Sequence, residues 1–334
     1  MTYRLGPGDV MTQITVILLG AGVMAGLVGL LLKRRHWLFT VAMLLAWSLS
    51  SVLVACGTYS YWYHHRRLPE PVDRSLFHGI DYRRVVRNEP RPLVIHAVRI
   101  DLTAPGIGFL VTPSDPSGGR TLSAQTTSQF LSRFGVQLAV NGGPFSPFYA
   151  NGPLSYYPRA GDPVDPTGLV ISNGNRYFEN ALDRPTLFLS ADNKVSIESP
   201  EWEIQNAITG FKAILKEGVL VSGLANGHNL KPSPRTAIAI DESGDYLMLF
   251  VIDGRQPKYS EGVTLRELAE IIVEYGGHTA VNMDGGGSST LVWQVPSGQP
   301  EVLNSPIHGR VPPGIERPVA THLGVYAIPL QCAE

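Results

Sequence analysis

The chain has 334 residues, 44% of them hydrophobic, and its formal net charge at pH 7 is −1. A charge so near zero gives no overall field that attracts nucleic acid or an anionic membrane, so any anion site must be local. The 35 glycines and 26 prolines are spread among short strand-like segments, which argues against a helical bundle.

Two apolar segments lie near the N-terminus. Residues 14–32 and 37–56 are each long enough to cross a bilayer, which takes about 20 residues. The basic cluster Lys33-Arg34-Arg35 between them predicts a helical hairpin with a cytoplasmic loop and both ends outside. A second interpretation makes this cluster the start of a signal peptide and Leu53-Val54-Ala55-Cys56 a lipobox, with Cys56 as the lipidated residue. Both make residues 1–56 a membrane anchor and the remainder extracytoplasmic.

Residues 57–92 are rich in aromatic, basic and proline residues, so we expect an interfacial belt and a linker there. The two cysteines, Cys56 and Cys332, allow no disulfide within the domain expected at residues 93–330. A core of more than about 200 residues is stable without one.

The domain is expected to begin with a strand at residues 93–102, followed by a helix at 121–134. Short strands separated by turns are expected between 167 and 221. The clearest helix is 264–275, because Thr264 and Glu267 are in capping-box register and glycines follow it. These elements predict an α+β fold with a mixed, curved central β-sheet and a few packed helices, preceded by the hydrophobic anchor.

The most informative segment is Asn282-Met283-Asp284-Gly285-Gly286-Gly287-Ser288-Ser289-Thr290. Strands are expected on both sides of it, at 279–283 and 291–295, so Asp284 lies at a strand end with a glycine turn beyond. Because glycines have no Cβ, the N–H groups of residues 285–287 can converge on an anion. A tight hairpin that needs the glycines only for positive φ remains an alternative.

Three other expected strands also begin or end in polar residues. Arg235 and Thr236 open the strand that runs to residue 240, and the strand 247–252 leads into Asp253-Gly254-Arg255. The strand 138–140 leads into Asn141-Gly142-Gly143. Ligand sites in sheet proteins favour loops beyond strand ends, so these segments are candidates for one site.

In this order the motifs resemble those of the phosphodiester glycosidase family. The resemblance covers roughly residues 90 to 330 and also includes Gly262-Val263-Thr264-Leu265, Asn304-Ser305-Pro306 and Arg317-Pro318-Val319. The loop after Asn141 is richer in proline than the family pattern. The resemblance implies hydrolysis of a sugar 1-phosphodiester, which releases the sugar and leaves a phosphomonoester on the other product.

The residue types suit that chemistry. Breaking the sugar C1–oxygen bond adds negative charge to the phosphate, and the guanidinium groups of Arg235 and Arg255 are suited to stabilise it. Asp284 is the first catalytic candidate, as a base for water or as a stabiliser of the sugar cation. Asp253 is the second, although an Asp-Gly turn explains it equally well. One carboxylate is sufficient here because the leaving group is already acidic.

The remaining substrate-binding candidates are polar or glycine residues of the same segments: Thr236, Asn141, Gly142, Gly285, Gly286, Gly287 and Ser288. Asn141 has an alternative role as part of an Asn-Gly turn. Four histidines lack metal-ligand spacing and are interpreted as surface or core residues: His228, His278, His308 and His322. We expect neither a metal nor a cofactor.

The sequence thus predicts a membrane-anchored hydrolase of glycosyl-1-phosphodiesters in envelope or extracellular glycans. Its expected partners are a glycan phosphodiester and the membrane, not nucleic acid. Two alternatives stay open. One is a non-catalytic module that binds anionic polysaccharide during exopolysaccharide export or assembly, and the other is a phosphodiesterase that cuts the phosphorus–oxygen bond.

Overall fold

A computed structural model describes residues 37–152, 155–180, 182–308 and 312–330. The chain divides into two units, Met1–Arg67 and Leu68–Glu334. The apolar segment 14–32, the basic cluster that follows it and Cys332 lie outside the described residues, as does the side chain of His228.

The described part of the first unit contains helix α2, Trp37–His64. Its candidate membrane span, Thr40–His64, has 25 residues and a mean hydropathy of 1.8. At about 1.5 Å per residue this span exceeds the roughly 30 Å hydrocarbon core of a bilayer. Cys56 lies within the helix and is exposed. A helix of this length and composition is typical of a membrane anchor or a signal sequence.

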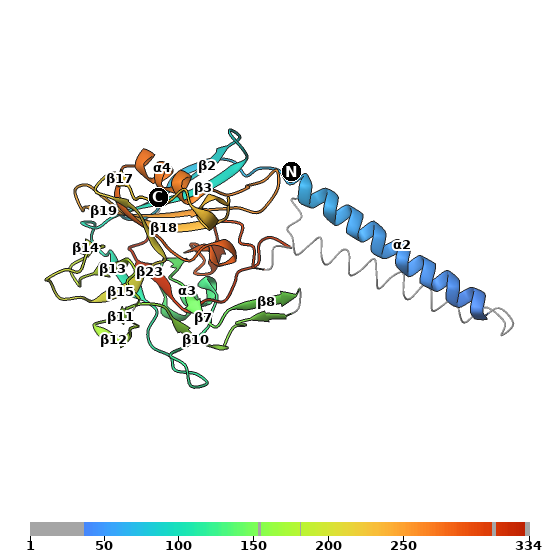
Figure 1. Ribbon diagram of the computed structural model, residues 1–334, viewed down its shortest axis with the longest axis horizontal. Coiled ribbons are helices and arrows are strands. Elements are labelled where there is room, and N and C mark those ends of the chain that lie inside the picture. Colours follow the sequence, from blue (N-terminus) through green and yellow to red (C-terminus); the bar gives the residue numbers. More distant parts are fainter. Residues whose placement is uncertain (1–36, 153–154, 181, 309–311, 331–334) are drawn as a thin grey trace. The chain divides into compact units, whose positions relative to one another are not determined.

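The second unit is built around an eight-stranded sheet, shown in Figure 1. Its strands in spatial order are β1 (Val72–Phe77), β2 (Ile80–Arg87), β3 (Leu93–Asp101), β19 (Tyr246–Ile252), β18 (Arg235–Asp241), β20 (Gly277–Asn282), β16 (Lys212–Lys216) and β17 (Val219–Leu220). All seven neighbouring pairs run antiparallel, so the sheet is not mixed in strand direction. The α+β class itself is confirmed.

Strands β1 and β2 lie in the range that the sequence suggested was linker. In β2, Ile80 and Tyr82 are buried, while Asp81 and Arg83 point to the other, polar face. Because the other face carries charged residues, the alternation of apolar and polar residues that marks a half-buried strand was not recognised. The expected strand after residue 92 is confirmed as β3.

Two five-stranded sheets complete the framework. The first has the order β22 (Pro300–Val302), β21 (Leu291–Gln294), β6 (Leu138–Asn141), β23 (His322–Tyr326), β4 (Gly108–Val111). The second has the order β12 (Asn175–Phe178), β11 (Val170–Ser172), β15 (Asn206–Thr209), β13 (Thr186–Leu189), β14 (Val195–Ser196). The largest hydrophobic core contains residues of all three sheets, including Val251, Val140 and Leu187. Burial of this apolar surface holds the sheets together.

Each of the two helices in this unit covers the outer face of a sheet. Helix α4 (Leu265–Glu274) packs on the large sheet, and α3 (Thr127–Phe134) packs on the sheet that contains β6 and β21 (Figure 1). The capping box of Thr264 and Glu267 is confirmed. Helix α3 begins later than expected, because Thr126 is its N-cap.

The remaining strands and turns that the structure describes in this unit are short. They are β5 (Leu122–Ser123), β10 (Pro163–Pro166) and β7 (Phe145–Ser146) in a three-stranded sheet, the hairpin of β8 (Tyr149–Gly152) and β9 (Ser155–Tyr157), and the 3-10 turns η2 (Gly227–Leu230) and η3 (Gly286–Ser288).

Candidate active site

The glycine turn connects β20 of the large sheet to β21 of the first five-stranded sheet. The N–H of Met283 donates to Thr236 O (2.8 Å), and the N–H of Asp284 donates to Gly142 O (3.1 Å). The N–H of Gly286 donates to Pro234 O (2.9 Å). These bonds tie the turn to the start of β18 and to the loop after β6, so three predicted segments meet at one place.

The three glycines of the turn have different roles. Of the three, Gly286 adopts the left-handed region, with φ +65°. A Cβ on Gly287 would lie 2.2 Å from Nη2 of Arg317, so a side chain at this position would displace the guanidinium. A Cβ on Gly285 would lie 3.0 Å from the carbonyl oxygen of Pro234.

Two of the three glycine amides are used within the protein. The N–H of Gly285 bonds to the carboxylate of Asp284, and that of Gly286 bonds to Pro234 O. An anion nest formed by all three amides is therefore not what the structure shows. Contact between the glycines and substrate stays a prediction, and the arginines around the turn are the clearer anion-binding groups.

Two predicted arginines lie beside the turn. Arg235 donates from Nε to Val263 O (3.2 Å), and Arg255 donates from Nη2 to Ser233 Oγ (3.3 Å). The guanidinium of Arg255 also borders Gly286, where a Cβ would lie 3.2 Å from Nη1. Burial and the charge of Arg255 lower the pKa of Arg235 to about 10, so the Arg235 guanidinium remains cationic at neutral pH.

Arg317 is a third arginine of the site, which the sequence analysis did not place there. Its Nη2 donates to His308 O (2.9 Å), and its Nη1 lies 3.4 Å from Ser288 Oγ. Burial lowers the pKa of Arg317, and the charge of Asp284 opposes this shift. The motif that contains Arg317 was part of the family resemblance, but its distance along the chain from the glycine turn gave no sign of contact.

Asp284 is half-buried at the centre of these groups. Burial raises the pKa of its carboxyl above the usual range. A hydrogen bond from Ser288, the charge of Arg317 and the N–H of Gly285 oppose the shift. A carboxylate whose pKa is moved toward neutrality is suited to accept a proton from water.

His308 also lies at the site, although the sequence analysis assigned it to the surface or core. Its ring packs on the ring of Tyr156, with centroids 4.6 Å apart. Burial and then the charge of Arg317 lower the pKa of His308, so its imidazole is neutral at pH 7.

Asp253 is linked to the turn through Asn304, and 1% of its surface is exposed. Its Oδ1 accepts from Asn304 Nδ2 (3.1 Å) and from the N–H of Ser305 (2.9 Å), and its Oδ2 lies 3.3 Å from His96 Nε2. Asn304 Nδ2 also donates to Ser289 O (3.0 Å). Through Asn304, these bonds help to position the turn. A catalytic role for Asp253 stays a prediction.

Asn141 connects the same parts of the fold. Its Oδ1 accepts from Thr236 Oγ1 (2.8 Å) and from the N–H of Thr290 (3.1 Å), and its Nδ2 donates to Asp284 O (2.7 Å). Gly142 donates its N–H to Thr321 O (2.7 Å). The side chains of Asn141 and Thr236 are buried, so these contacts position the turn. Their predicted contact with substrate stays a prediction.

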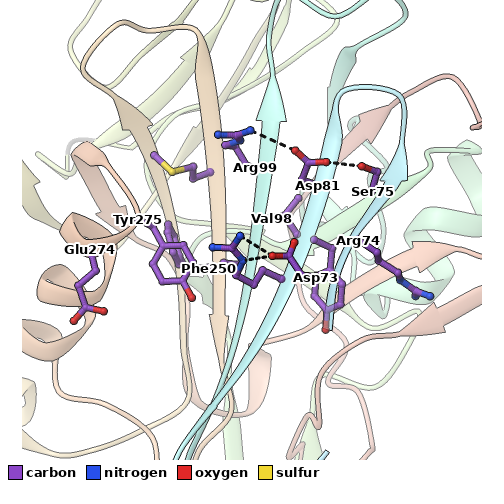
Figure 2. Close-up of a pocket in the computed structure, with 13 residues that line it drawn as sticks. Asp73, Arg74, Ser75, Asp81, Val98, Arg99, Phe250, Glu274 and Tyr275 are labelled. Carbon is purple, nitrogen blue, oxygen red and sulfur yellow. Dashed lines mark hydrogen bonds and ion pairs between the residues drawn. The ribbon is translucent and has the colours of Figure 1, made fainter. Parts of the chain in front are cut away.

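A cavity of about 580 Å³ lies elsewhere, lined by residues of β1, β2, β3 and β19 and the end of α4 (Figure 2). Four of its charged side chains form ion pairs, Asp73 with Arg83 (2.6 Å) and Asp81 with Arg99 (3.5 Å). None of the predicted site residues lines it. The candidate active site is defined by converging charges, not by this cavity.

In the described ranges, no group of three or more His, Cys, Asp or Glu residues is placed to hold a metal ion. The expectation that the protein uses no metal or cofactor stays a prediction.

A family model described as phosphodiester glycosidase matches residues 134–326, which is more than half of the chain and includes all the site residues above. The chain belongs to the phosphodiester glycosidase family. A curated relative, bovine (Bos taurus) N-acetylglucosamine-1-phosphodiester alpha-N-acetylglucosaminidase, is 27% identical over 194 residues, which cover 55% of this chain and 36% of the relative. The chain thus matches only about a third of that protein's length.

Two solved structures share the fold of this member of the family. The catalytic domain of the zebrafish N-acetylglucosamine-1-phosphodiester alpha-N-acetylglucosaminidase, auto-inhibited by a pro-peptide, superposes with a TM-score of 0.52 at 20% identity, covering 80% of this chain and 86% of that chain. A hypothetical protein from Synechocystis superposes with a TM-score of 0.52 at 15% identity, covering 78% of this chain and 64% of that chain.

Proposed function

We propose that this member of the family hydrolyses the sugar C1–oxygen bond of glycosyl-1-phosphodiesters. The observation that carries the proposal is the convergence of three arginines on the glycine turn beside Asp284. Arg235 and Arg255 border Gly285 and Gly286, and Arg317 contacts Ser288 and lies against Gly287. Three cations and one carboxylate give the site a positive field that suits a phosphodiester.

The balance of charge favours the transition state over the bound substrate. A phosphodiester carries one negative charge, and departure of its oxygen from C1 leaves the phosphate with nearly two. The arginines therefore interact more strongly with the phosphate as the bond breaks, which is the condition for catalysis. Their guanidinium groups are held by carbonyl and hydroxyl partners before substrate arrives.

In the proposed step, a water oxygen bonds to C1 as the C1–O bond breaks. The electron pair of that bond remains on the phosphate oxygen, and a proton of the water passes to Asp284. The products are a free sugar and a phosphomonoester. Asp284 alternatively stabilises the positive charge that develops on the sugar ring. Asn141, Thr236 and Asp253 hold the turn in position and do not touch the reacting atoms in this scheme.

We place the substrate among envelope or extracellular glycans, because α2 is long and apolar enough to anchor the domain to a membrane. In the hairpin anchor the second unit is extracytoplasmic. Lipidation of Cys56 gives the same placement, and mass spectrometry of the mature N-terminus distinguishes the two anchors.

Hydrolysis in ¹⁸O-labelled water tests the proposal. The methyl ester of α-N-acetylglucosamine 1-phosphate, incubated with the full chain in detergent, is expected to yield label in the sugar. Label in the phosphate would instead show a phosphodiesterase, and binding without turnover would show a binding module. Asp284→Asn is expected to lose turnover and keep phosphate binding. The exposed Asp245→Asn is the matched control and is expected to keep both.

A further inference from the structure

The hairpin of β8 and β9 projects from the body of the second unit (Figure 1). Its register pairs Tyr149 with Tyr157 and Ala150 with Tyr156. Directly opposite residues share one face of a hairpin and successive residues alternate, so Tyr156 points to the opposite side from Tyr149 and Tyr157. The rings of Tyr149 and Tyr157 stack with centroids 5.1 Å apart, and Tyr157 donates its hydroxyl to Pro163 O (2.6 Å).

The other face of the hairpin turns toward the candidate active site. The Tyr156 ring packs on His308, and the Arg317 guanidinium lies 4.5 Å from the centroid of the Phe148 ring. Arg317 also donates to the carbonyl of His308, so the two contacts are adjacent. Phe148 nevertheless keeps 44% of its surface exposed. We call the pair Phe148 and Tyr156 the aromatic ledge.

The contacts of Asp284 connect it to Arg317. Asp284 bonds to Ser288, and Ser288 in turn contacts Nη1 of Arg317. Arg235, by contrast, is not among the groups that act on Asp284, and it donates to the carbonyls of Val263 and Lys231. The reacting C1 must lie beside the carboxylate that acts on it, so the sugar lies on the side of Arg317.

We propose that the aromatic ledge of Phe148 and Tyr156 is the sugar-binding subsite, with the substrate's sugar toward the ledge and its aglycone toward Arg235. This inference rests on the proposed function, since it takes the position of C1 from the role of Asp284. The C–H groups on one face of a pyranose ring are apolar and weakly positive. They complement the negative face of an aromatic ring, and C1 is joined to the phosphate through one oxygen, which brings the sugar within reach of the ledge.

Steady-state kinetics of the full chain in detergent test the subsite. We expect Phe148→Ala and Tyr156→Ala each to raise KM for the methyl ester of α-N-acetylglucosamine 1-phosphate by about tenfold. Inhibition by inorganic phosphate is expected to change less than about twofold, because the phosphate contacts remain. Tyr156→Phe keeps the ring and is expected to retain the wild-type KM. Tyr149→Ala removes a ring that is as exposed as that of Phe148 from the opposite face of the hairpin and is the matched control.

A second ester tests the direction of binding. The benzyl ester of the same sugar phosphate is expected to lose the same factor in both ledge variants, since the ledge contacts the sugar. A loss confined to the benzyl ester would place the aglycone on the ledge and overturn the proposal. An unchanged KM in both variants would overturn it too. So would a parallel loss of phosphate inhibition, which would show that the ledge only supports Arg317.

A failure of the proposed function would give a different result from a failure of the subsite. If the wild-type chain turns over neither ester, calorimetric binding of the methyl ester replaces KM as the measurement. A tenfold loss of affinity in the ledge variants then supports the subsite in a non-catalytic protein, and equal affinities overturn it.

Discussion

Substitution of Asp253 separates a positioning role from a catalytic one. Asp253→Asn can keep an oxygen toward Asn304 and Ser305 while its new NH₂ group faces the His96 ring. Asp253→Ala removes the acceptor altogether. A general base or nucleophile would be lost in both variants, whereas a positioning residue is lost mainly in the alanine variant.

The magnitude follows from the two bonds to Oδ1. Each hydrogen bond to a charged acceptor contributes about 1.5–3 kcal/mol, so removing both costs about 3–6 kcal/mol in the free energy of unfolding. The alanine variant also relieves the desolvation of a buried carboxylate, which offsets part of that cost. We therefore expect a loss near 3 kcal/mol, which lowers Tm by about 6–12 °C at roughly 2–4 °C per kcal/mol.

The assay is thermal unfolding of the full chain in detergent, followed by near-UV circular dichroism, together with turnover of the methyl ester below the unfolding transition. Asp253→Asn is expected to keep turnover within about tenfold of wild type, because the acceptor toward Asn304 remains. An asparagine variant that melts like wild type and yet has no turnover would refute the positioning role and restore Asp253 as a catalytic residue.

Three further predictions concern the charged groups of the site. Inorganic phosphate at about 100 times its Kd should stabilise the fold by about 2.7 kcal/mol and raise Tm, and an unchanged Tm would argue against an anion site. Arg235→Lys loses the planar fork and is expected to lower kcat/KM by about 10–100-fold, so a wild-type value would remove Arg235 from phosphate binding. Because burial raises the pKa of Asp284 from 3.8, its ionisation costs stability, and this cost develops as pH rises through the interval between 3.8 and the folded pKa. Asp284→Asn should therefore melt above wild type at pH 8, with a difference that disappears near pH 3.8; a variant less stable at pH 8 would contradict the sign.

Local signals made part of the fold predictable. Thr264 and Glu267 are three residues apart and cap the same helix, so the sequence contains the whole interaction. The strands that begin at Arg235 and end at Ile252 were likewise evident, because they are buried on both faces and read as continuous apolar runs. Strand β2 was missed because one of its faces is charged, and β1 was missed because three successive exposed residues follow its first residue.

The site was less predictable than its scaffold, because its contacts join distant parts of the chain. The sequence indicated that the amide of Gly286 was available for an anion, but in the structure Pro234 O accepts its hydrogen bond. Arg317 contacts a serine 29 residues away, and no spacing rule connects such positions. Sequence motifs identified the residues that gather at the turn, but which of them face substrate depends on tertiary hydrogen bonds.

Some buried polar atoms around the turn have hydrogen-bond partners within the protein, and others do not. The side-chain oxygens of Asn141 and Asp253 accept hydrogen bonds within the protein. In the described part of the chain, the buried polar atoms without a partner include Nε of Arg317 and Nδ1 of His308, as well as Asn282 Oδ1, Ser289 Oγ and Thr290 Oγ1 in the turn segment. An unsatisfied buried polar group costs about 1–3 kcal/mol, so these atoms lower the stability of the free protein. Phosphate oxygens are acceptors that satisfy a donor such as Nε, and they become stronger acceptors as the C1–oxygen bond breaks. In the proposed reaction, we therefore expect an unsatisfied donor such as Arg317 Nε to stabilise the transition state more than the bound substrate.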